Sequence, residues 1–219
     1  MNKISKNFLF VGILICLISK TAHCQSVKII LKNSSKLLNG KYHIYEPILK
    51  IQARYKDTTE AKNETPEELM TSIVSSNSKL WEKYNAAEFD ENESYTFVKG
   101  IEYELLSKLE FEIDSLPMAI IKFKLIKPDE VKKIVGVAII KKNSKRWKTT
   151  SSYYVNRLSI AFLVFRENIM QNLILKNPKN NIEKKLLEKC YSNGLDIEKL
   201  LSQDFTKEQK EYFINPLNW

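Results

Sequence analysis

Apolar and polar residues alternate through the middle of the chain, from about residue 105 to residue 150. Four runs carry the pattern, LLSKLEFEID, MAIIKFKLIK, VGVAIIKK and KRWKTTS, and short polar breaks separate them. In the first run the apolar residues share one parity and the charged residues share the other: Leu105, Leu109, Phe111 and Ile113 against Lys108, Glu110, Glu112 and Asp114. Alternation of this kind is typical of strands with one buried and one solvated face. The pattern therefore predicts an antiparallel sheet.

The first two runs also predict a hairpin with a definite register. The turn signal between them is Asp114-Ser115-Leu116-Pro117. A register that pairs Glu112 with Lys122 places both side chains on the solvated face. The same register sets three further pairs side by side: Glu110 with Lys124, Ile113 with Ile121, and Phe111 with Phe123. Because each such pair stabilises a sheet by about 0.2–1 kcal/mol, we expect this register.

Before the sheet, residues 27–31 predict a short edge strand, and Asn39-Gly40 predicts a hairpin turn. The next apolar run, residues 42–55, is broken in two by Pro47, and its second half could be a helix or a strand. Residues 57–64 are polar and predict a linker.

Helical signals flank the sheet on both sides. Thr65-Pro66-Glu67-Glu68 predicts a helix that reaches about Tyr84, because a threonine cap, a first-turn proline and first-turn acids all favour a helix start. The apolar stripe of this helix is interrupted at Ser76 and Asn77, which predicts a bend or a close approach to the sheet. After the sheet, helices are predicted over residues 153–176, 182–192, 196–202 and 206–214, and Trp219 is expected to dock on the body.

The first 24 residues have the pattern of a signal peptide. Lys3 and Lys6 precede the apolar stretch FLFVGILICLI, which is shorter than the roughly 20 residues of a membrane span. Small residues at Ala22 and Cys24 favour cleavage between Cys24 and Gln25, which predicts a secreted or periplasmic protein. Two alternatives stay open: Cys24 could be the acylated first residue of a lipoprotein, or the stretch could be an uncleaved anchor.

Cleavage would change the charge and the cysteine content. It removes Lys3, Lys6 and Lys20 and no acids, so the formal net charge falls from +9 to +6. The basic surplus is therefore partly a property of the leader. Cys190 becomes the one remaining cysteine, which excludes an intrachain disulfide in the mature chain, and we expect its thiol to be buried.

From Thr65 onward the order of elements resembles the nuclear transport factor 2-like superfamily. The resemblance covers residues 65–152 and depends on the order of a capped helix, a loop and long antiparallel strands, and on the ending NSKRWKTTS. The chain differs from the family pattern in having Asn143-Ser144 in place of an Asp-Gly turn, and in continuing for about 65 residues of helix after the sheet. The resemblance implies a cone-like domain in which a strongly curved sheet wraps around helices.

We therefore expect an α+β fold, in which an N-terminal helix packs on a strongly curved antiparallel sheet and a C-terminal helical extension follows. The helix that begins at Thr65 is expected to cover the apolar face of the sheet. The predicted division is a signal peptide at 1–24, strands and a linker at 25–64, a curved-sheet domain at 65–152 and a helical extension at 153–219.

No catalytic or metal-binding residue is assigned. Enzymes of the resembled superfamily place an aspartate, or an aspartate and a histidine, inside the cone. Here His43 is the one histidine that follows the leader, and it lies outside residues 65–152. Glu110, Glu112 and Asp114 have the parity of the solvated face. Phosphate-binding, dinucleotide and nucleophile-elbow glycine motifs are absent from the sequence, and one histidine with one cysteine does not supply a metal site.

The densest basic run lies near the end of the sheet, with aromatic residues among and after the cations: Lys141, Lys142, Lys145, Arg146 and Lys148 with Trp147, Tyr153 and Tyr154. Such a run could contact an anionic polymer. Export disfavours a nucleic acid, and a lysine-rich hairpin also serves solubility alone.

These patterns lead to a functional hypothesis. We expect an exported, non-enzymatic protein without a cofactor, a nucleic-acid partner or a transmembrane segment in its mature form, which binds a small apolar ligand or a protein partner. One alternative is an enzyme that uses an acid and a tyrosine such as Tyr103 in the cone. Another is an envelope lipoprotein anchored through Cys24.

Overall fold

A seven-stranded sheet forms the centre of the computed structural model, which describes residues 24–31, 36–92, 97, 99–128 and 134–215. The strand order is β6-β5-β4-β3-β2-β1-β7, and every pair is antiparallel except β1 with β7. The strands are β1 (Gln25–Leu31), β2 (Lys36–Ile51), β3 (Glu102–Ile113), β4 (Leu116–Ile126), β5 (Ile134–Asn143), β6 (Arg146–Thr149) and β7 (Leu195–Asp196). The α+β class and the four-strand antiparallel middle are confirmed.

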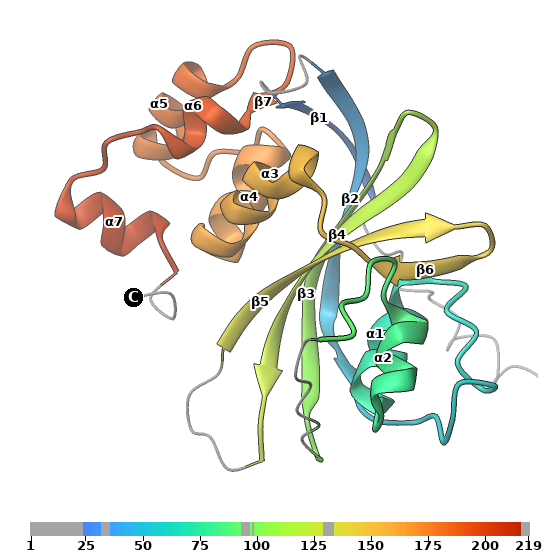
Figure 1. The fold of residues 1–219 in the computed structure, drawn as a ribbon. Helices are drawn as coiled ribbons and strands as arrows, with labels where there is room; N and C mark the ends of the chain where they lie inside the picture. The colour runs from blue at the N-terminus through green and yellow to red at the C-terminus, as the bar shows by residue number, and fades with distance from the viewer. Residues whose placement is uncertain (1–23, 32–35, 93–96, 98, 129–133, 216–219) are drawn as a thin grey trace, which may run out of the picture.

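The helices lie in two groups on the two sides of this sheet (Figure 1). The first group is α1 (Pro66–Ser75) and α2 (Lys79–Asn85). The second group is α3 (Tyr153–Val164), α4 (Glu167–Ile174), α5 (Asn181–Cys190), α6 (Ile197–Leu201) and α7 (Lys207–Phe213). No helix in the described part of the chain is long and apolar enough to cross a membrane. The predicted signal peptide, apart from Cys24, and the predicted docking of Trp219 lie outside the described residues.

The helix predicted from Thr65 to about Tyr84 is divided into α1 and α2. The Thr65 hydroxyl accepts from the Glu68 N–H at 3.2 Å, as the cap signal predicts, but the Glu68 carboxylate reaches back to the Glu64 N–H. The chain leaves the helix at Ser76, where the interrupted stripe predicted a bend. A second cap at Ser78 then begins α2.

The single helix predicted over residues 153–176 is also divided in two. At the break, the Arg166 N–H donates to the Phe213 carbonyl and the Asn215 N–H donates to the Val164 carbonyl, both at 2.8 Å. The backbone at residues 164–166 is therefore hydrogen-bonded to the end of α7 and does not continue the helix. The three shorter C-terminal helices are confirmed, within a few residues at their ends.

The predicted hairpin register between β3 and β4 is wrong. The turn contains two residues, Asp114 and Ser115, both with positive φ (51° and 65°). Two-residue turns with positive φ match the twist of the flanking strands. Glu112 therefore lies opposite Pro117, and Lys122 lies opposite Ser107.

The predicted facing of the β3 side chains is also wrong, because β3 has a β-bulge at Leu106. Leu105 pairs with Phe123 and Ser107 pairs with Lys122, so one extra residue lies on β3 between the two pairs. The bulge reverses the facing of the strand, and Leu105 therefore points to the opposite side of the sheet from Leu109.

Replacement of Ser115 with glycine is expected to stabilise the protein by about 0.5 kcal/mol. An L-residue with positive φ is about 1–2 kcal/mol less stable than in its preferred conformation, and the greater freedom of glycine in the unfolded chain offsets part of the gain. Urea unfolding of the variant measures the change. A lower unfolding midpoint would contradict the turn geometry.

The N-terminal strands differ from two predictions. Asn39-Gly40 lies inside β2 and makes no turn, because Gly40 pairs with Phe111 of β3. The glycine allows a close approach of the two strands there, since a Cβ atom at residue 40 would lie 3.0 Å from the Glu110 carbonyl oxygen. β1 is not an edge strand, because β7 pairs with it. The break at Pro47 is confirmed, since the pairing of β2 with β3 is interrupted between Ile44 and Leu49.

Two buried clusters occupy the two faces of the sheet. The large core joins β1–β4 to α3–α7 and includes Leu109, Phe111 and Phe162. The small core joins α1 to the other face and includes Leu69 and Leu105. The Thr65 helix packs on the sheet, as predicted, but the prediction that it covers the apolar face with Leu109 and Phe111 is wrong. The C-terminal helices cover that face, and α1 lies on the opposite one. The predicted domain boundary at residue 152 stays a prediction, and the large core crosses it.

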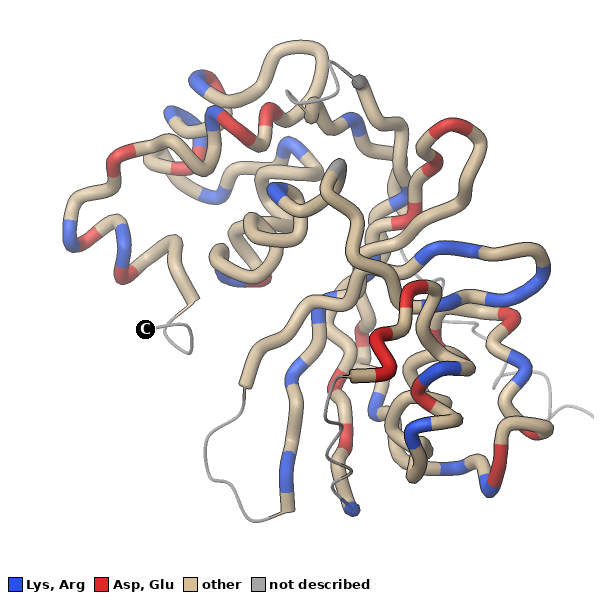
Figure 2. The backbone as a smooth tube through the Cα atoms, in the orientation of Figure 1, with Lys and Arg blue, Asp and Glu red and all other residues tan. Residues whose placement is uncertain are grey.

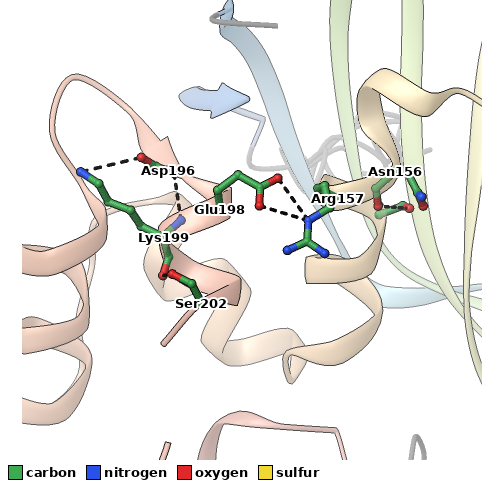
Figure 3. A network of polar contacts seen from close by, with 7 residues as sticks. Asn156, Arg157, Asp196, Glu198, Lys199 and Ser202 are labelled. Atoms are coloured by element: carbon green, nitrogen blue, oxygen red, sulfur yellow. Dashed lines mark hydrogen bonds and ion pairs between the residues drawn. The ribbon is translucent and has the colours of Figure 1, made fainter. Parts of the chain in front are cut away.

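A polar contact also joins the C-terminal helices to each other. The Arg157 Nε on α3 donates to both carboxylate oxygens of Glu198 on α6, at 3.1 Å each (Figure 3). The side chain of Asp196 caps α6 by accepting from the Lys199 N–H at 3.0 Å. The Arg157–Glu198 contact therefore joins α6 to α3, and the Asp196 cap stabilises the start of α6.

Candidate functional site

An open cavity of about 910 Å³ lies on the sheet face that points away from the C-terminal helices. Its lining comes from alternate residues of neighbouring strands, with further backbone between them. The side chains that face it from the first five strands include Ser26, Lys28, Asn39, Lys41, Glu110, Glu112, Pro117 and Lys142. Trp147, which belongs to the small core, lines it too. The cavity therefore adjoins the part of the sheet that α1 covers.

The cavity combines charged and apolar walls. Lys28, Lys41 and Lys142 line it, and none of the three makes an ion pair within the described part of the chain. Leu37 is 39 % exposed beside them. A hollow of this kind offers cations, hydrogen-bonding groups and apolar surface to one ligand.

A charged cluster on the same face shares Glu110 with the cavity. The Lys108 ammonium lies 2.8 Å from Glu67 Oε1 and 3.0 Å from Glu110 Oε1. The Tyr45 hydroxyl donates to Glu67 at 2.5 Å. The cluster connects α1, which carries Glu67, to β2 and β3.

The contacts of this cluster decide its protonation. Burial acts to raise the pKa of Glu67, but the hydrogen bonds from Lys108 and Tyr45 and the charge of Lys108 lower that pKa below its ordinary value. Burial acts to lower the pKa of Lys108, but the hydrogen bond and charge of Glu67 raise it. Burial and Glu67 raise the pKa of Tyr45. Glu67 is therefore a carboxylate, Lys108 an ammonium and Tyr45 a neutral phenol near neutral pH.

His43 joins this cluster, although it lies outside residues 65–152. It pairs in register with Lys108, and its ring lies 4.6 Å from that of Tyr45. Burial, and next the charge of Lys108, lower the pKa of His43 below 6.5, so the imidazole is neutral at pH 7. The sequence contains no local sign of this grouping, because it depends on the pairing of β2 with β3.

The Glu67→Gln substitution is expected to make stability less dependent on acid pH. A carboxylate whose pKa is lower in the folded state stabilises the fold above the unfolded value of 4.5, and this contribution is lost as pH falls through the folded pKa. Unfolding midpoints from about pH 6 to pH 3 should therefore fall less steeply for the variant. Parallel curves for variant and wild type would show that Glu67 has no lowered pKa.

The three acids predicted to face solvent lie in three different environments. Glu110 lies in the charged cluster, Glu112 is exposed at the cavity, and Asp114 lies in the β3–β4 turn. Tyr103, the candidate of the alternative enzyme, does not line the cavity. Its ring lies 4.5 Å from that of Phe123, and burial and then the charge of Glu82 raise its pKa to about 12.

Three of the five cations in the basic run have contacts within the chain. Lys141 pairs with Glu88 at 2.5 Å, Arg146 lies over the Tyr84 ring at 5.0 Å, and the Lys148 ammonium donates to the Ala86 carbonyl at 3.2 Å. Figure 2 shows this hairpin beside the acidic segment that follows α2. These contacts fasten the hairpin to α2, and of the remaining two cations Lys142 faces the cavity.

Sequence reasoning missed a second polar cluster, which is buried in the large core. Lys122, predicted on the solvated face, is 1 % exposed. Its ammonium donates to the Phe165 carbonyl at 2.6 Å and lies 3.3 Å from the Glu167 carboxylate, which also accepts from the Tyr42 hydroxyl at 2.6 Å. Burial lowers the pKa of Lys122, and Glu167 opposes this shift. The cluster fastens the start of α4 to the centre of the sheet.

The described residues contain no group of three or more histidine, cysteine or acidic side chains placed to hold a metal ion. Cys190 is buried, as predicted, and burial raises the pKa of its thiol to about 11. Its thiol is therefore protonated near neutral pH.

Comparison of the chain with protein-family models, with curated proteins and with solved structures found no match.

Proposed function

We propose that the chain is an exported, non-enzymatic protein that binds a small ligand in the cavity beside α1, on the sheet face away from the C-terminal helices. The observation that carries the proposal is the open hollow of about 910 Å³ between β1, β2, β3 and the β5–β6 hairpin. Ligand sites of proteins are commonly about 300–1,000 Å³ and combine apolar surface with a few placed polar groups. The walls of this cavity have that composition.

The charged cluster beside the cavity supports a binding role over catalysis. Each of its main groups has a partner within the protein: Glu67 with Lys108 and Tyr45, and Lys108 with Glu110 as well. A general base or nucleophile is instead directed at a substrate. The cluster therefore has a structural role: it fastens α1 to the sheet at the edge of the cavity.

Export is part of the same proposal and depends on the sequence pattern of residues 1–24. Under it, the chain begins at Gln25, one residue before the cavity-lining Ser26. Mass spectrometry of the mature N-terminus tests it: a first residue at Gln25 is the expected result, and an acylated Cys24 would replace the secreted form with a lipoprotein.

The binding function is tested by blocking the cavity. A library of small organic molecules is screened against the wild type by ligand-observed saturation-transfer NMR, and hits are then measured on Asn39→Trp. Because Asn39 faces the cavity from β2, the indole should displace ligands and abolish their signals. The matched control is Lys50→Trp, an exposed position on the same strand that does not line the cavity.

The expected result is a set of hits lost in Asn39→Trp and kept in Lys50→Trp. A library without hits on the wild type, or hits that survive Asn39→Trp, would contradict ligand binding at this cavity. Binding of a protein partner through the same face would then be the remaining hypothesis.

A further inference from the structure

We propose that the ligand of the cavity is an amphipathic anion, whose negative group is held between Lys28 and Lys41. This inference rests on the proposed ligand-binding function and adds the chemical class of the ligand. It comes from the register of β1 and β2, the charge left unpaired in the cavity and the apolar surface beside it.

The register places four polar side chains in one block. Lys28 pairs with Asn39, and Ser26 pairs with Lys41, on adjacent antiparallel strands. Lys28 and Lys41 are therefore diagonal neighbours, with Cα atoms about 7–8 Å apart. Two lysine side chains at this separation reach a common anion. The amide of Asn39 and the hydroxyl of Ser26 lie between them as further hydrogen-bond donors.

The charge of the block is not neutralised by its neighbours. Glu110 pairs in register with Lys41, and its carboxylate shares the Lys108 ammonium, 3.0 Å away, with Glu67. With the neighbouring cluster counted in, the four lysines Lys28, Lys41, Lys108 and Lys142 lie against the three acids Glu67, Glu110 and Glu112, which leaves one positive charge. The cavity therefore has an excess of positive charge, which complements an anionic ligand.

The apolar residues that line the cavity indicate that the ligand also has an apolar part. Leu37 lies on the same strand and face as Asn39 and is 39 % exposed. Pro117 and Trp147 line the cavity from β4 and β6. A ligand with an aliphatic or aromatic body and one carboxylate, sulfonate or phosphate group uses both kinds of surface. An inorganic anion alone would leave the apolar surface unused.

Two fluorescent probes that differ in one charged group test the inference. 8-Anilinonaphthalene-1-sulfonate carries the sulfonate, and N-phenyl-1-naphthylamine is the same skeleton without it. Both are titrated into the wild type, into Lys28→Met with Lys41→Met, and into a control with Lys50→Met and Lys184→Met. The control removes two exposed lysines that do not line the cavity.

The anionic probe is expected to bind the wild type more tightly than the neutral one. The double substitution at Lys28 and Lys41 should weaken the anionic probe about tenfold, which corresponds to loss of about 1.4 kcal/mol from two partly solvated contacts. The neutral probe should change by less than about twofold, since its contacts are apolar. A variant with Lys28→Arg and Lys41→Arg keeps both charges and should keep the affinity.

The outcomes separate the two proposals. Equal binding of the anionic probe to the wild type and to the Lys28→Met, Lys41→Met variant would overturn the anion site. Tighter binding of the neutral probe to the wild type would also overturn it and leave the binding function in place. If neither probe binds the wild type, the amphipathic-anion proposal fails, and the library screen with Asn39→Trp decides the binding function separately.

Discussion

Replacement of Phe162 with alanine is expected to lower the free energy of unfolding of the whole chain by about 3–5 kcal/mol. Phe162 is fully buried on α3, and its ring packs edge-on against Tyr42 of β2 at 6.2 Å. The substitution leaves a cavity between the C-terminal helices and the sheet. Because both contribute to one large core, the loss should affect them together.

Urea unfolding followed by tryptophan fluorescence and by far-UV circular dichroism measures the loss of stability. The experiment uses a Trp219→Phe background, in which the tryptophan fluorescence comes from Trp81 and Trp147. Both indoles lie on the α1 side of the sheet, whereas far-UV circular dichroism reports on all helices. The urea transitions from the two probes should coincide and shift together in Phe162→Ala. Leu80→Ala is the control, because Leu80 is 77 % exposed and its loss should change stability by less than about 0.5 kcal/mol.

A separate result would support the predicted boundary at residue 152. If the fluorescence transition stayed in place while the circular dichroism transition moved, the C-terminal helices would unfold on their own. The shared core would then contribute little to the stability of the sheet.

Replacement of Lys122 with methionine is expected to destabilise the protein by about 3 kcal/mol. The cost comes from Glu167 and the Phe165 carbonyl, which lose their cationic partner inside the large core. Methionine has a similar length and no charge, so the loss measures the ion pair more than the packing. Urea unfolding at constant pH gives the change in free energy.

The double variant Lys122→Met with Glu167→Leu should recover part of that loss, because it removes the carboxylate left without its cation. The Tyr42 hydroxyl and the Phe165 carbonyl still lose their partners in this variant, so the recovery should be incomplete. Lys124→Met, two residues along the same strand and less buried, is the matched control and should change stability by less than about 0.5 kcal/mol. An effect of Lys122→Met as small as that of the control would show that the buried pair does not stabilise the fold.

Local signals in the sequence predicted the elements well. The Thr65 cap, the interruption at Ser76 and the capping residues Asp196 and Thr206 act within one helical turn, and each is found as expected. The alternating runs became β3 to β6 in the predicted order. Information of this kind lies in a few neighbouring residues, and a single sequence therefore carries it.

Registers and faces were less predictable, because small local changes have large consequences. The two-residue turn at Asp114 and Ser115 places Glu112 opposite Pro117 and not opposite Lys122, and the bulge at Leu106 reverses the facing of β3. Both β4 parities are apolar near Ile121, so hydrophobicity alone did not identify the buried face. Lys122 was consequently predicted on the wrong side of the sheet.

The candidate site could be predicted only in part. The sequence placed Glu110 and Glu112 on a charged face, and that face lines the cavity. The lysines Lys28 and Lys41 come from β1 and β2, and the sequence contained no sign that these strands continue the sheet beside β3. The pairing of β2 with β3 brings together residues about 70 positions apart in the sequence, such as Lys41 and Glu110.

The sequence by itself determined the class of the fold, the helix starts, the strand runs and the charged character of one sheet face, because each follows from contacts between near neighbours in the chain. The tertiary structure decided which helices cover which face, where the buried lysine lies and which strands enclose the cavity. These depend on pairings between distant segments, whose free energies come from packing the whole core at once.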